Sequence, residues 1–492
     1  MKSRITPALA VILCACSAAD PEPLLPPIEV VEHDLHPSVF ITAFDLHVDP
    51  ALVDSVRFAV RPRPGAQARP LGATYAIDAL SVDGGTIVVP IFGLYADYAN
   101  LVELTVTFTS GGSTTVPATV QAGAWVDAMG PYDELQVTRA VDPARRPDFS
   151  YIHLENETEQ GPLIVDIDGY VRWAGLDDAR RWPNFFDGER FVIGDEDAIS
   201  FLALDGTKVR VPLVVEGFDA VLPHRAITFG PQGYLLSVDV RRTGEPYFED
   251  APVLIEVDEH GAVLNTWDLG QIIADHISAA GGDPSGLVRP DEEWFVLNST
   301  LYSPEDDSLI VSSREHFVMK VGYTTKQIQW ILGDETKHWY VNFPSLRALS
   351  LGSSDPKPIG QHALSFVDGD LLLFNNGEPS IRQPDDAPVG QRLPSSLAMI
   401  YAVDEVTMTA QVSWQYDAGY HADFCSSVYR AGGDYLLTYA SLGDDLWRKR
   451  AVIQGIDEGG ALLFELVVPE SEGLCRPWNS KPVALEDLQF DG

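Results

Sequence analysis

Positive charge is scarce in this chain. Its 492 residues include 33 lysines and arginines against 72 aspartates and glutamates, which gives a formal net charge of -39. A surface this acidic repels phosphate backbones, so we expect no nucleic-acid partner. It also repels small anions at long range. An anionic substrate would therefore need a local cluster of arginine or histidine side chains.

Long apolar runs and helical periodicity are also scarce. After the N-terminal segment, no stretch reaches the roughly 18 apolar residues that a membrane-spanning helix needs. Hydrophobic residues still make up 45% of the chain, which supports a packed core and excludes wholesale disorder. Strand-forming and turn-forming residues dominate, so the composition favours an all-β protein.

Sequence signatures of metal and nucleotide sites are missing. The chain has no paired-histidine spacing typical of zinc enzymes, no EF-hand loop, no phosphate-binding P-loop and no convincing dinucleotide-binding glycine motif. Acidic turns such as residues 187–197 are expected to be solvated. We therefore expect neither a metal ion nor a cofactor.

What is present is a strand-pair unit that recurs six times. In each copy an alternating apolar run meets a short turn and a second alternating run follows, which is typical of a β-hairpin. The copies begin at Leu163, Phe201, Val253, Val318, Met399 and Ala451. A hairpin cannot bury its apolar face alone, so tandem copies predict sheets that pack on one another. Six copies predict a six-bladed β-propeller, which places its chemistry at one end of a central channel.

A second repeated unit supplies the other half of the blades. Its copies begin at Pro223, Trp294, Gln361 and Phe424. Each holds a polar or special residue, a short strand, a Gly/Asp turn and an apolar strand. The innermost strands of a propeller run beside its axis, so these units place equivalent residues of successive blades near the channel. Those residues are His224, Asn298, His362 and Cys425.

The N-terminus is predicted to be a lipoprotein signal peptide over residues 1–16. Lys2 and Arg4 form a positive segment, and residues 8–13 form a short apolar stretch. Cys16 ends a sequence that looks like a bacterial lipobox and is the predicted lipidation site; an ordinary secretory signal is the alternative. The protein would then be exported and held at the periplasmic or outer-membrane surface, with membrane contact only through the lipid anchor.

The rest of the chain divides into four segments. Residues 17–35 read as a Pro-rich linker, 36–122 as an immunoglobulin-like β-sandwich of short strands, 123–147 as a connector and 148–492 as the propeller. In an oxidising compartment the two remaining cysteines, Cys425 and Cys475, are expected to form a disulfide between the last two blades; two buried thiols are the alternative.

Several stretches together resemble the bacterial arylsulfotransferase family. They are GLYADYAN from Gly93, WFVLNS from Trp294, DDSLIVSSRE from Asp306, IQWILGD from Ile328, FPSLRAL from Phe343, GQHALSF from Gly360, LLLFNNG from Leu371 and FCSSVY from Phe424. The resemblance implies a sandwich on a six-bladed propeller that moves a sulfuryl group from a phenolic sulfate to a phenol. It implies no nucleotide donor and no metal, and a route through a sulfated histidine. Donor and acceptor are the expected partners, and a homodimer is left open.

The resemblance also implies site residues. His362 matches a catalytic-centre histidine, to which we assign charge stabilisation or proton transfer. Arg382 matches the active-site arginine, with Arg392 as its rival. Arg314 is expected to bind sulfate, or alternatively to pair with Glu315. Each cationic group would stabilise the negative charge that develops on sulfuryl and phenolate.

Two features depart from the family pattern: residue 296, and the late strand that ends in LLTYAS, which has no histidine where the family's sulfated histidine is expected. Val296 stands where a histidine is expected, and valine can neither donate a proton nor attack sulfur. His421 is the only late histidine that could take the nucleophile's place. The residues expected to bind substrate are Asn298, His224 and Asn376. Because of Val296, a binding propeller that has lost the chemistry is the second hypothesis, and a hydrolase in which water replaces the phenol is the third.

Overall fold

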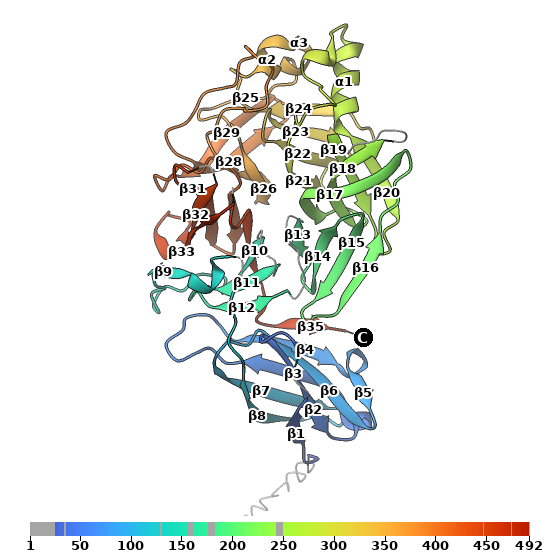
Figure 1. Cartoon of the computed structure of the whole chain (residues 1–492), viewed down its shortest axis with the longest axis vertical. Helices are drawn as coiled ribbons and strands as arrows, with labels where there is room; N and C mark the ends of the chain where they lie inside the picture. The colour runs from blue at the N-terminus through green and yellow to red at the C-terminus, as the bar shows by residue number, and fades with distance from the viewer. Residues whose placement is uncertain are drawn as a thin grey trace, which may run out of the picture.

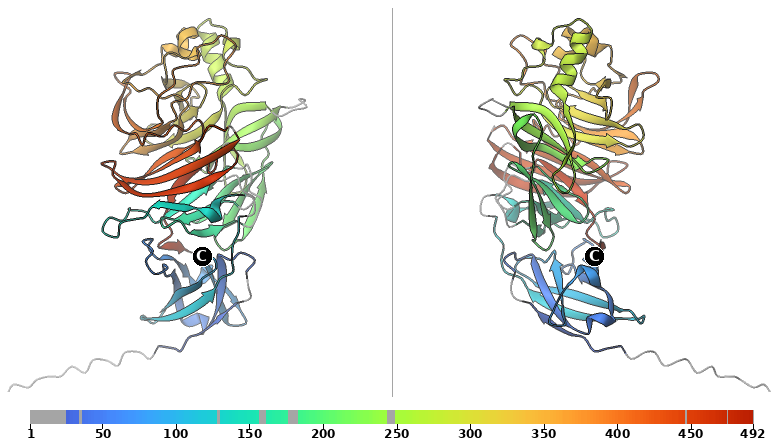
Figure 2. Two further views of the ribbon diagram at one scale, coloured as in Figure 1. Left: turned by 60° about the vertical axis from the view of Figure 1, so that its left-hand side comes forward. Right: turned by 90° about the vertical axis from the view of Figure 1, so that its right-hand side faces the viewer.

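The structure, a computed structural model, describes residues 25–33, 36–127, 130–155, 161–175, 183–242, 249–445, 447–473 and 475–491. The predicted signal peptide and Cys16 lie outside these residues. The described chain is almost entirely β-structure. An N-terminal sandwich lies below a ring of sheets, and three short helices lie at the far end of the ring (Figures 1 and 2). The predicted all-β class is confirmed.

The sandwich has two antiparallel layers that also contain one parallel pair. The first sheet contains, in order, β1 (Glu29–Glu32), β2 (Ile41–His47), β6 (Thr86–Phe92) and β5 (Ser81–Asp83). The second contains β35 (Leu488–Phe490), β4 (Leu71–Ala76), β3 (Val53–Val60), β7 (Ala99–Phe108) and β8 (Ser113–Gln121). Period-two alternation explains the layers. In β7, Val102, Leu104 and Val106 are fully buried, while the residues between them face outward.

Six further sheets of the described residues are arranged around a common centre (Figure 1). The strands of each sheet are given from the centre outward. The first sheet contains β34 (Asn479–Val483), β10 (Tyr151–Glu155), β11 (Leu163–Asp166) and β12 (Val171–Ala174), and the second contains β13 (Asn184–Phe186), β14 (Arg190–Asp195), β15 (Ala198–Ala203) and β16 (Lys208–Pro212). The third contains β17 (Phe218–Phe229), β18 (Tyr234–Arg242), β19 (Glu249–Val257) and β20 (Val263–Asp268). The fourth contains β21 (Leu297–Ser303), β22 (Ser308–Ser313), β23 (Val318–Gly322) and β24 (Ile328–Leu332). The fifth contains β26 (His362–Val367), β27 (Asp370–Asn375), β28 (Leu397–Asp404), β29 (Thr409–Tyr416) and β25 (Gly352–Ser353). The sixth contains β30 (Ser427–Ala431), β31 (Asp434–Leu442), β32 (Arg448–Asp457), β33 (Leu462–Glu472) and β9 (Gln136–Arg139).

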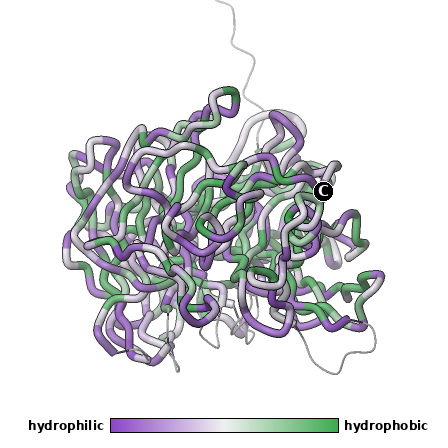
Figure 3. The backbone as a smooth tube through the Cα atoms, turned by 90° about the horizontal axis from the view of Figure 1, so that it is seen from above, coloured by the Kyte–Doolittle hydropathy of each residue, from purple (hydrophilic) through white to green (hydrophobic). Residues whose placement is uncertain are grey.

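The inner strands close the ring. Contacts run from β10 to β13, β17, β21, β26 and β30 in turn, and β30 then meets β34, the strand that pairs with β10. The C-terminal strand β34 therefore completes the first sheet. Each predicted hairpin forms the third and fourth strands of one sheet, counted from the centre, and each copy of the second unit forms the two inner strands; β25 and β9 add a fifth strand outside the hairpins of the fifth and sixth sheets. Figure 3 shows that hydrophobic and hydrophilic stretches both occur throughout the chain. Strands such as β10, β22 and β23 are buried on both faces, because each sheet lies between two neighbouring sheets.

The domain boundaries differ from the prediction at three short strands. β1 lies in the predicted linker but pairs with β2 in the sandwich. β9 lies in the predicted connector but pairs with β33 at the edge of the sixth sheet. β35 follows the propeller but pairs in parallel with β4 of the sandwich. Each of them is only three or four residues long, too short to show a clear alternation of its own.

A buried ion pair joins the two domains. Arg172 of β12 and Asp166 of β11 have fully buried side chains that pair at 3.1 Å. The Arg172 guanidinium also donates to the carbonyl of Gly93 in the sandwich and lies 3.7 Å from the centre of the Tyr95 ring. Gly93 has a φ of +80°, and a Cβ there would meet Leu71 at 2.2 Å. The stretch GLYADYAN thus anchors the sandwich to the propeller.

Helices are few. The longest is α1 (Leu269–Ala279), followed by α2 (His338–Asn342) and α3 (Pro344–Arg347). The 3₁₀ turns are η1 (Pro50–Leu52), η2 (Ile77–Ala79), η3 (Tyr132–Glu134) and η4 (Pro284–Gly286). Among the described residues, no helix has the length and apolar character needed to cross a bilayer.

Candidate active site

A cavity of about 310 Å³ lies where the six inner strands meet. Every sheet contributes to its wall. Its lining includes Glu155, Phe185, Arg225, Val296, Asn298, His362, Ala363, Cys425, Ser426, Tyr429, Trp478, Asn479 and Lys481. Its volume falls at the small end of the range for small-molecule sites. The channel therefore has room for a single-ring substrate rather than a polymer.

Four consecutive sheets share an unusual backbone feature at this wall. Arg225, Val296, Ala363 and Ser426 have φ values of 74°, 53°, 52° and 80°, the left-handed region that residues with a side chain rarely adopt. The register of the inner strand pair shifts across Arg225 and across Ala363, and in the fourth sheet it shifts just after Val296, between Leu297 and Ser299. Such bulges re-aim side chains and are common beside active sites. The repeated unit in the sequence therefore corresponds to a repeated local distortion that faces the cavity.

His362 is held in one tautomer. Its Nδ1 lies 2.8 Å from Asn376 Oδ1 and 3.0 Å from the carbonyl of Gly360. The Asn376 amide nitrogen donates to the carbonyls of Ala422 and Cys425, so its oxygen must face the imidazole. Both neighbours of Nδ1 are therefore acceptors, and Nδ1 must carry the proton. This leaves the lone pair on Nε2, which is the state of imidazole that can attack an electrophile.

The surroundings keep the imidazole neutral. Burial above all, together with the nearby positive charges of Arg314 and Arg225, lowers the pKa of His362 from 6.5 to about 4, against the hydrogen bonds that Nδ1 donates to Asn376 and Gly360. The Nε2 lone pair is thus present at neutral pH. Two guanidinium groups close enough to act on the ring also form a local positive field in a very acidic protein.

Arg314 presents two donors without partners. It lies at the end of β22, and its side chain is 4% exposed. Its Nη1 pairs with Glu315 at 2.6 Å, whereas Nε and Nη2 are buried and have no hydrogen-bond partner among the described residues. Arg314 thus pairs with Glu315, one of the two alternatives expected from the sequence, and still has two donors for the other, the binding of a sulfate group. Buried donors without partners are costly, so such a group is suited to an anionic ligand.

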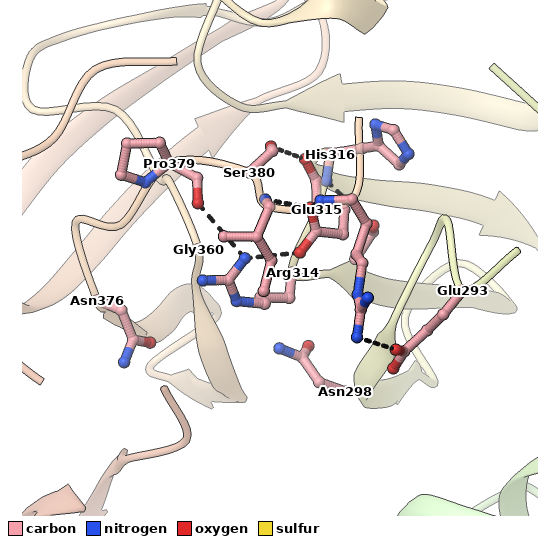
Figure 4. A network of polar contacts seen from close by, with 12 residues as sticks. Glu293, Asn298, Arg314, Glu315, His316, Gly360, Asn376, Pro379 and Ser380 are labelled. Carbon is pink, nitrogen blue, oxygen red and sulfur yellow. Dashed lines mark hydrogen bonds and ion pairs between the residues drawn. The ribbon is translucent and has the colours of Figure 1, made fainter. Parts of the chain in front are cut away.

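Glu315 braces this side of the site (Figure 4). Its side chain is fully buried, and it pairs with Arg314. Its second carboxylate oxygen accepts from the backbone amides of Ile381 and Arg382 at 2.8 and 2.9 Å, and its carbonyl accepts from Ser380 and Lys337. The loop after β27 and the Arg314 guanidinium are therefore fixed by one carboxylate.

Arg225 and Arg382 share a carboxylate, Glu293. Arg225 lines the cavity and pairs with Glu293, which also pairs with Arg382 at 2.8 Å. Arg382 itself is 53% exposed and does not line the cavity; its rival Arg392 is 60% exposed and pairs with Glu378. The cavity-lining guanidinium is thus Arg225, which the sequence analysis did not name. Its position beside His224 in the repeated unit was the available signal.

The residues expected to bind substrate divide into two groups. Asn298 lines the cavity; its amide nitrogen donates to the carbonyl of Gln361, and its oxygen is buried without a partner among the described residues. Asn376 is fully buried behind His362 and orients it. His224 lies outside the main cavity, with Nδ1 2.8 Å from Asp239. Only Asn298 of the three therefore faces the cavity.

His421 belongs to a separate charged cluster. Its Nε2 lies 2.6 Å from Glu378 and 3.9 Å from Asp423, and it does not line the cavity. These three groups have their ligand atoms within 4.8 Å of one another. Arg392 pairs with Glu378 and Lys449 pairs with Asp423, so the negative charges of both carboxylates are balanced by side chains of the protein. The cluster is best described as an ion-pair network beside the site.

The predicted disulfide is present. Cys425 and Cys475 are bonded, with their Cα atoms 6.2 Å apart. Cys425 precedes β30, and Cys475 precedes β34, so the bond ties the closing strand to the sixth sheet. The amide of Ser426 donates to the carbonyl of Trp478 beside it. The disulfide thereby fixes part of the cavity wall.

Fold and site together define a propeller-like ring of sheets with an uncharged imidazole, His362, and a guanidinium, Arg225, in the wall of its central cavity. Residues 133–473 match the family model described as arylsulfotransferase (ASST), and residues 43–122 match the arylsulfotransferase Ig-like domain. The first match covers more than half of the chain, so the chain belongs to the arylsulfotransferase family.

Curated relatives carry the same name. The chain is 28% identical over 222 residues to the arylsulfate sulfotransferase AssT of Escherichia coli O6:H1, and 27% identical over 226 residues to that of Lelliottia amnigena. Each match covers 36% of this chain and 36% of the relative. The chain thus spans little more than a third of the length of these relatives.

Solved structures match only loosely. The Cps50 (Swd1) β-propeller domain of Myceliophteria thermophila is 11% identical, with a TM-score of 0.34, over 69% of this chain and 91% of that one. BamB of Moraxella catarrhalis is 10% identical, with a TM-score of 0.28, over 81% and 89%. Likeness at this level carries no argument about activity.

Proposed function

We propose that this protein transfers a sulfuryl group from a phenolic sulfate ester to a phenol, with the Nε2 atom of His362 as nucleophile. The observation that carries the proposal is the fixed tautomer. Nδ1–H is held by Asn376 and Gly360, so the lone pair is on Nε2, and the residue lines the cavity. From the sequence alone, His362 is expected only to stabilise charge or transfer a proton, and the geometry of its two ring nitrogens supports the role of nucleophile.

In the first step the Nε2 lone pair forms a bond to sulfur, and the sulfur–oxygen bond to the aryl group breaks. The electron pair leaves with the aryl oxygen, and the phenolate takes a proton from solvent. The imidazole then carries the sulfuryl group on Nε2 and becomes cationic, and Asn376 and Gly360 stabilise that cation by accepting from Nδ1–H. Arg314 and Arg225 stabilise the negative charge on the sulfuryl oxygens.

In the second step an acceptor phenol takes the place of the first product. Its oxygen attacks sulfur, the bond between Nε2 and sulfur breaks, and the electron pair returns to Nε2. The phenolic proton is released to solvent. The cavity wall near Asn298 offers an acceptor oxygen without a partner among the described residues, which suits a phenolic O–H.

The test is phenol-dependent release of nitrophenolate from 4-nitrophenyl sulfate and other aryl sulfates. We expect His362→Ala to lose activity by about 10³-fold or more. His260→Ala is the matched control, because His260 lies in a turn and is 81% exposed. Without acceptor, the wild type should carry one added SO₃ group on the peptide that contains His362. Full activity of His362→Ala would end the proposal.

The same assay separates the competing functions. Release of nitrophenolate that is independent of phenol would support the hydrolase. Binding of aryl sulfates without any turnover by the wild type would support the binding propeller, which Val296 favours because it places an inert side chain at the cavity wall. In that case Val296→His is the variant to assay for a gain of activity.

We also propose that the protein is an exported lipoprotein anchored through Cys16. The support is the sequence alone: a positive segment, a short apolar stretch and a lipobox-like sequence. In a diderm host, Cys16→Ser should move the protein from the membrane fraction to the soluble fraction, and Cys14→Ser, its matched control, should not. Unchanged fractionation of Cys16→Ser would contradict the anchor.

A further inference from the structure

The cavity has a second polar end that the proposed reaction does not use. His362, Arg225 and Val296 come from the third, fourth and fifth sheets. Across the channel, the first, second and sixth sheets contribute Lys481 of β34, Phe185 of β13 and Tyr429 of β30, together with Trp478 and Asn479. A substrate that fills the cavity therefore contacts both groups of residues.

Lys481 is the charged group at this end. Its Nζ lies 5.0 Å from the centre of the Phe185 ring and 5.4 Å from that of Tyr429. No carboxylate of the described residues lies within the 4.0 Å of an ion pair. By contrast, the lysines that pair with carboxylates are Lys208, Lys320, Lys357 and Lys449. In a chain with a net charge of -39, an ammonium without a paired carboxylate inside a cavity is suited to a negative ligand.

The nearest acidic group compensates this charge only weakly. Glu155 also lines the cavity and attracts Lys481, but it lies beyond ion-pair distance. Burial raises the pKa of Glu155, which favours its neutral form.

Two further polar atoms at this end are free. Trp478 Nε1 and Asn479 Oδ1 are buried without a hydrogen-bond partner in the part of the chain that the structure describes. The Asn479 amide nitrogen donates to the Tyr429 hydroxyl at 3.1 Å, which fixes the orientation of the amide. An indole N–H and an ammonium in the wall of one cavity are both donors for an oxyanion, and the aromatic rings provide the flat walls that a benzene ring needs.

We infer that the Lys481 end of the cavity binds an anionic substituent, such as a carboxylate, on the ring of a single-ring phenolic substrate. The inference rests on the proposed function for the reacting end, and it names the substrate class: phenols with a second, negatively charged group across the ring from the reacting oxygen. Lys481 is then a specificity residue. It discriminates an acid from its neutral ester by charge, while His362 acts on the phenolic oxygen.

The first test is binding, which does not require turnover. Isothermal titration compares 4-hydroxybenzoate with its methyl ester. Wild type should bind the acid at least about 10-fold more tightly, and Lys481→Met should bind the two equally, because methionine keeps the packing and removes the charge. Lys481→Arg should retain the preference. Lys326→Met is the matched control, because Lys326 also lies over an aromatic ring, 5.9 Å from the centre of Trp267, but outside the cavity.

Equal binding of acid and ester by the wild type, or no binding of the acid, overturns the inference. A preference that Lys481→Met retains overturns it as well. Thermal unfolding of each variant shows whether the fold is intact, and Lys481→Arg keeps the test valid if the methionine variant is unstable.

The second test is turnover of the sulfate esters of the same two phenols. Turnover of both esters with equal kcat/KM would leave the proposed function standing and overturn the substrate class. A binding preference for the acid with no turnover by the wild type would leave the inferred ligand class standing and overturn the proposed function. If Lys481→Met lost kcat equally on both compounds, Lys481 would act at the sulfuryl group, and the inference would fail.

Discussion

The electronic state of His362 is set by its neighbours rather than by its own chemistry. A histidine in water is half protonated near pH 6.5. Here burial and two guanidinium groups oppose the proton on Nε2, while Asn376 and Gly360 hold the proton on Nδ1. Asn376 is therefore a positioning residue, and the imidazole is a preformed nucleophile.

This state predicts a pH profile. Because burial and Arg314 lower the pKa of His362 to about 4, the imidazole stays neutral above that pH, and the acid limb of kcat/KM should lie near pH 4 rather than 6.5. Arg314→Gln should move the limb to higher pH, since it removes a positive charge. Arg314→Lys keeps the charge and should leave the limb in place while lowering the rate. A wild-type limb near 6.5 would contradict this account.

Single residues were predictable from the sequence only where a motif marked them. His362 and Arg314 lie in stretches that resemble the family; His362 lines the cavity, and Arg314 lies outside the lining but close enough to act on the pKa of the imidazole. Arg225 and Lys481 also line the cavity, but their roles depend on which strands meet at the channel. Arg382 and His421 lie in irregular loops outside the cavity lining, where they pair with Glu293 and Glu378, and no local pattern indicates these pairings.

At the scale of elements, the repeated left-handed positions are the main finding. A non-glycine residue in this region costs about 1–2 kcal/mol, and four sheets accept that cost at equivalent places around the channel. Ala363 follows His362 directly, so its backbone determines the direction of the imidazole. The distortion is part of how the site is built.

Ala363→Gly tests this strain. Glycine removes the conformational penalty but adds flexibility to the unfolded chain, so stability should be unchanged or rise by up to about 1 kcal/mol. Ala398→Gly is the control, because Ala398 is a buried alanine in the regular strand β28, and it should lose about 1 kcal/mol. Chemical denaturation measures both. An equal loss in the two variants would show that Ala363 is not strained.

The disulfide gives a second prediction at this scale. It joins residues 50 positions apart and fixes the start of β34 beside the cavity. The double variant Cys425→Ser, Cys475→Ser should lose about 2–4 kcal/mol of unfolding free energy, because the unfolded chain gains freedom. It should also raise KM, since Cys425 and Trp478 are cavity walls. Unchanged stability and KM would show that the bond has no role in the fold.

The hairpins were predictable because period-two alternation is local information. The pairings that the sequence did not indicate are those of β9, β34 and β35, whose partner strands are far away in the sequence. No local pattern specifies such partners, since tertiary packing selects them. The sheets were therefore predictable from the sequence, and the way in which the ring closes was not.

At the scale of the whole molecule, Arg172 and Asp166 predict how firmly the domains are joined. Arg172→Met leaves a buried carboxylate without its partner and should cost about 3–5 kcal/mol. Arg57→Met is the control; Arg57 pairs with Asp487, and their side chains are 41% and 65% exposed, so the loss should stay below about 1 kcal/mol. Urea denaturation compares them. Similar small losses would indicate that the buried pair is dispensable.

The closing strand β34 has a consequence for synthesis. Lys481, Asn479 and Trp478 lie in or just before β34 and are therefore made after every other strand of the ring, and β35, which follows them, pairs with β4 of the sandwich. A growing or prematurely terminated polypeptide therefore has an open ring and half a binding chamber. The chamber is complete only once β34 pairs with β10 and contacts β30, so one late pairing event joins the first and sixth sheets.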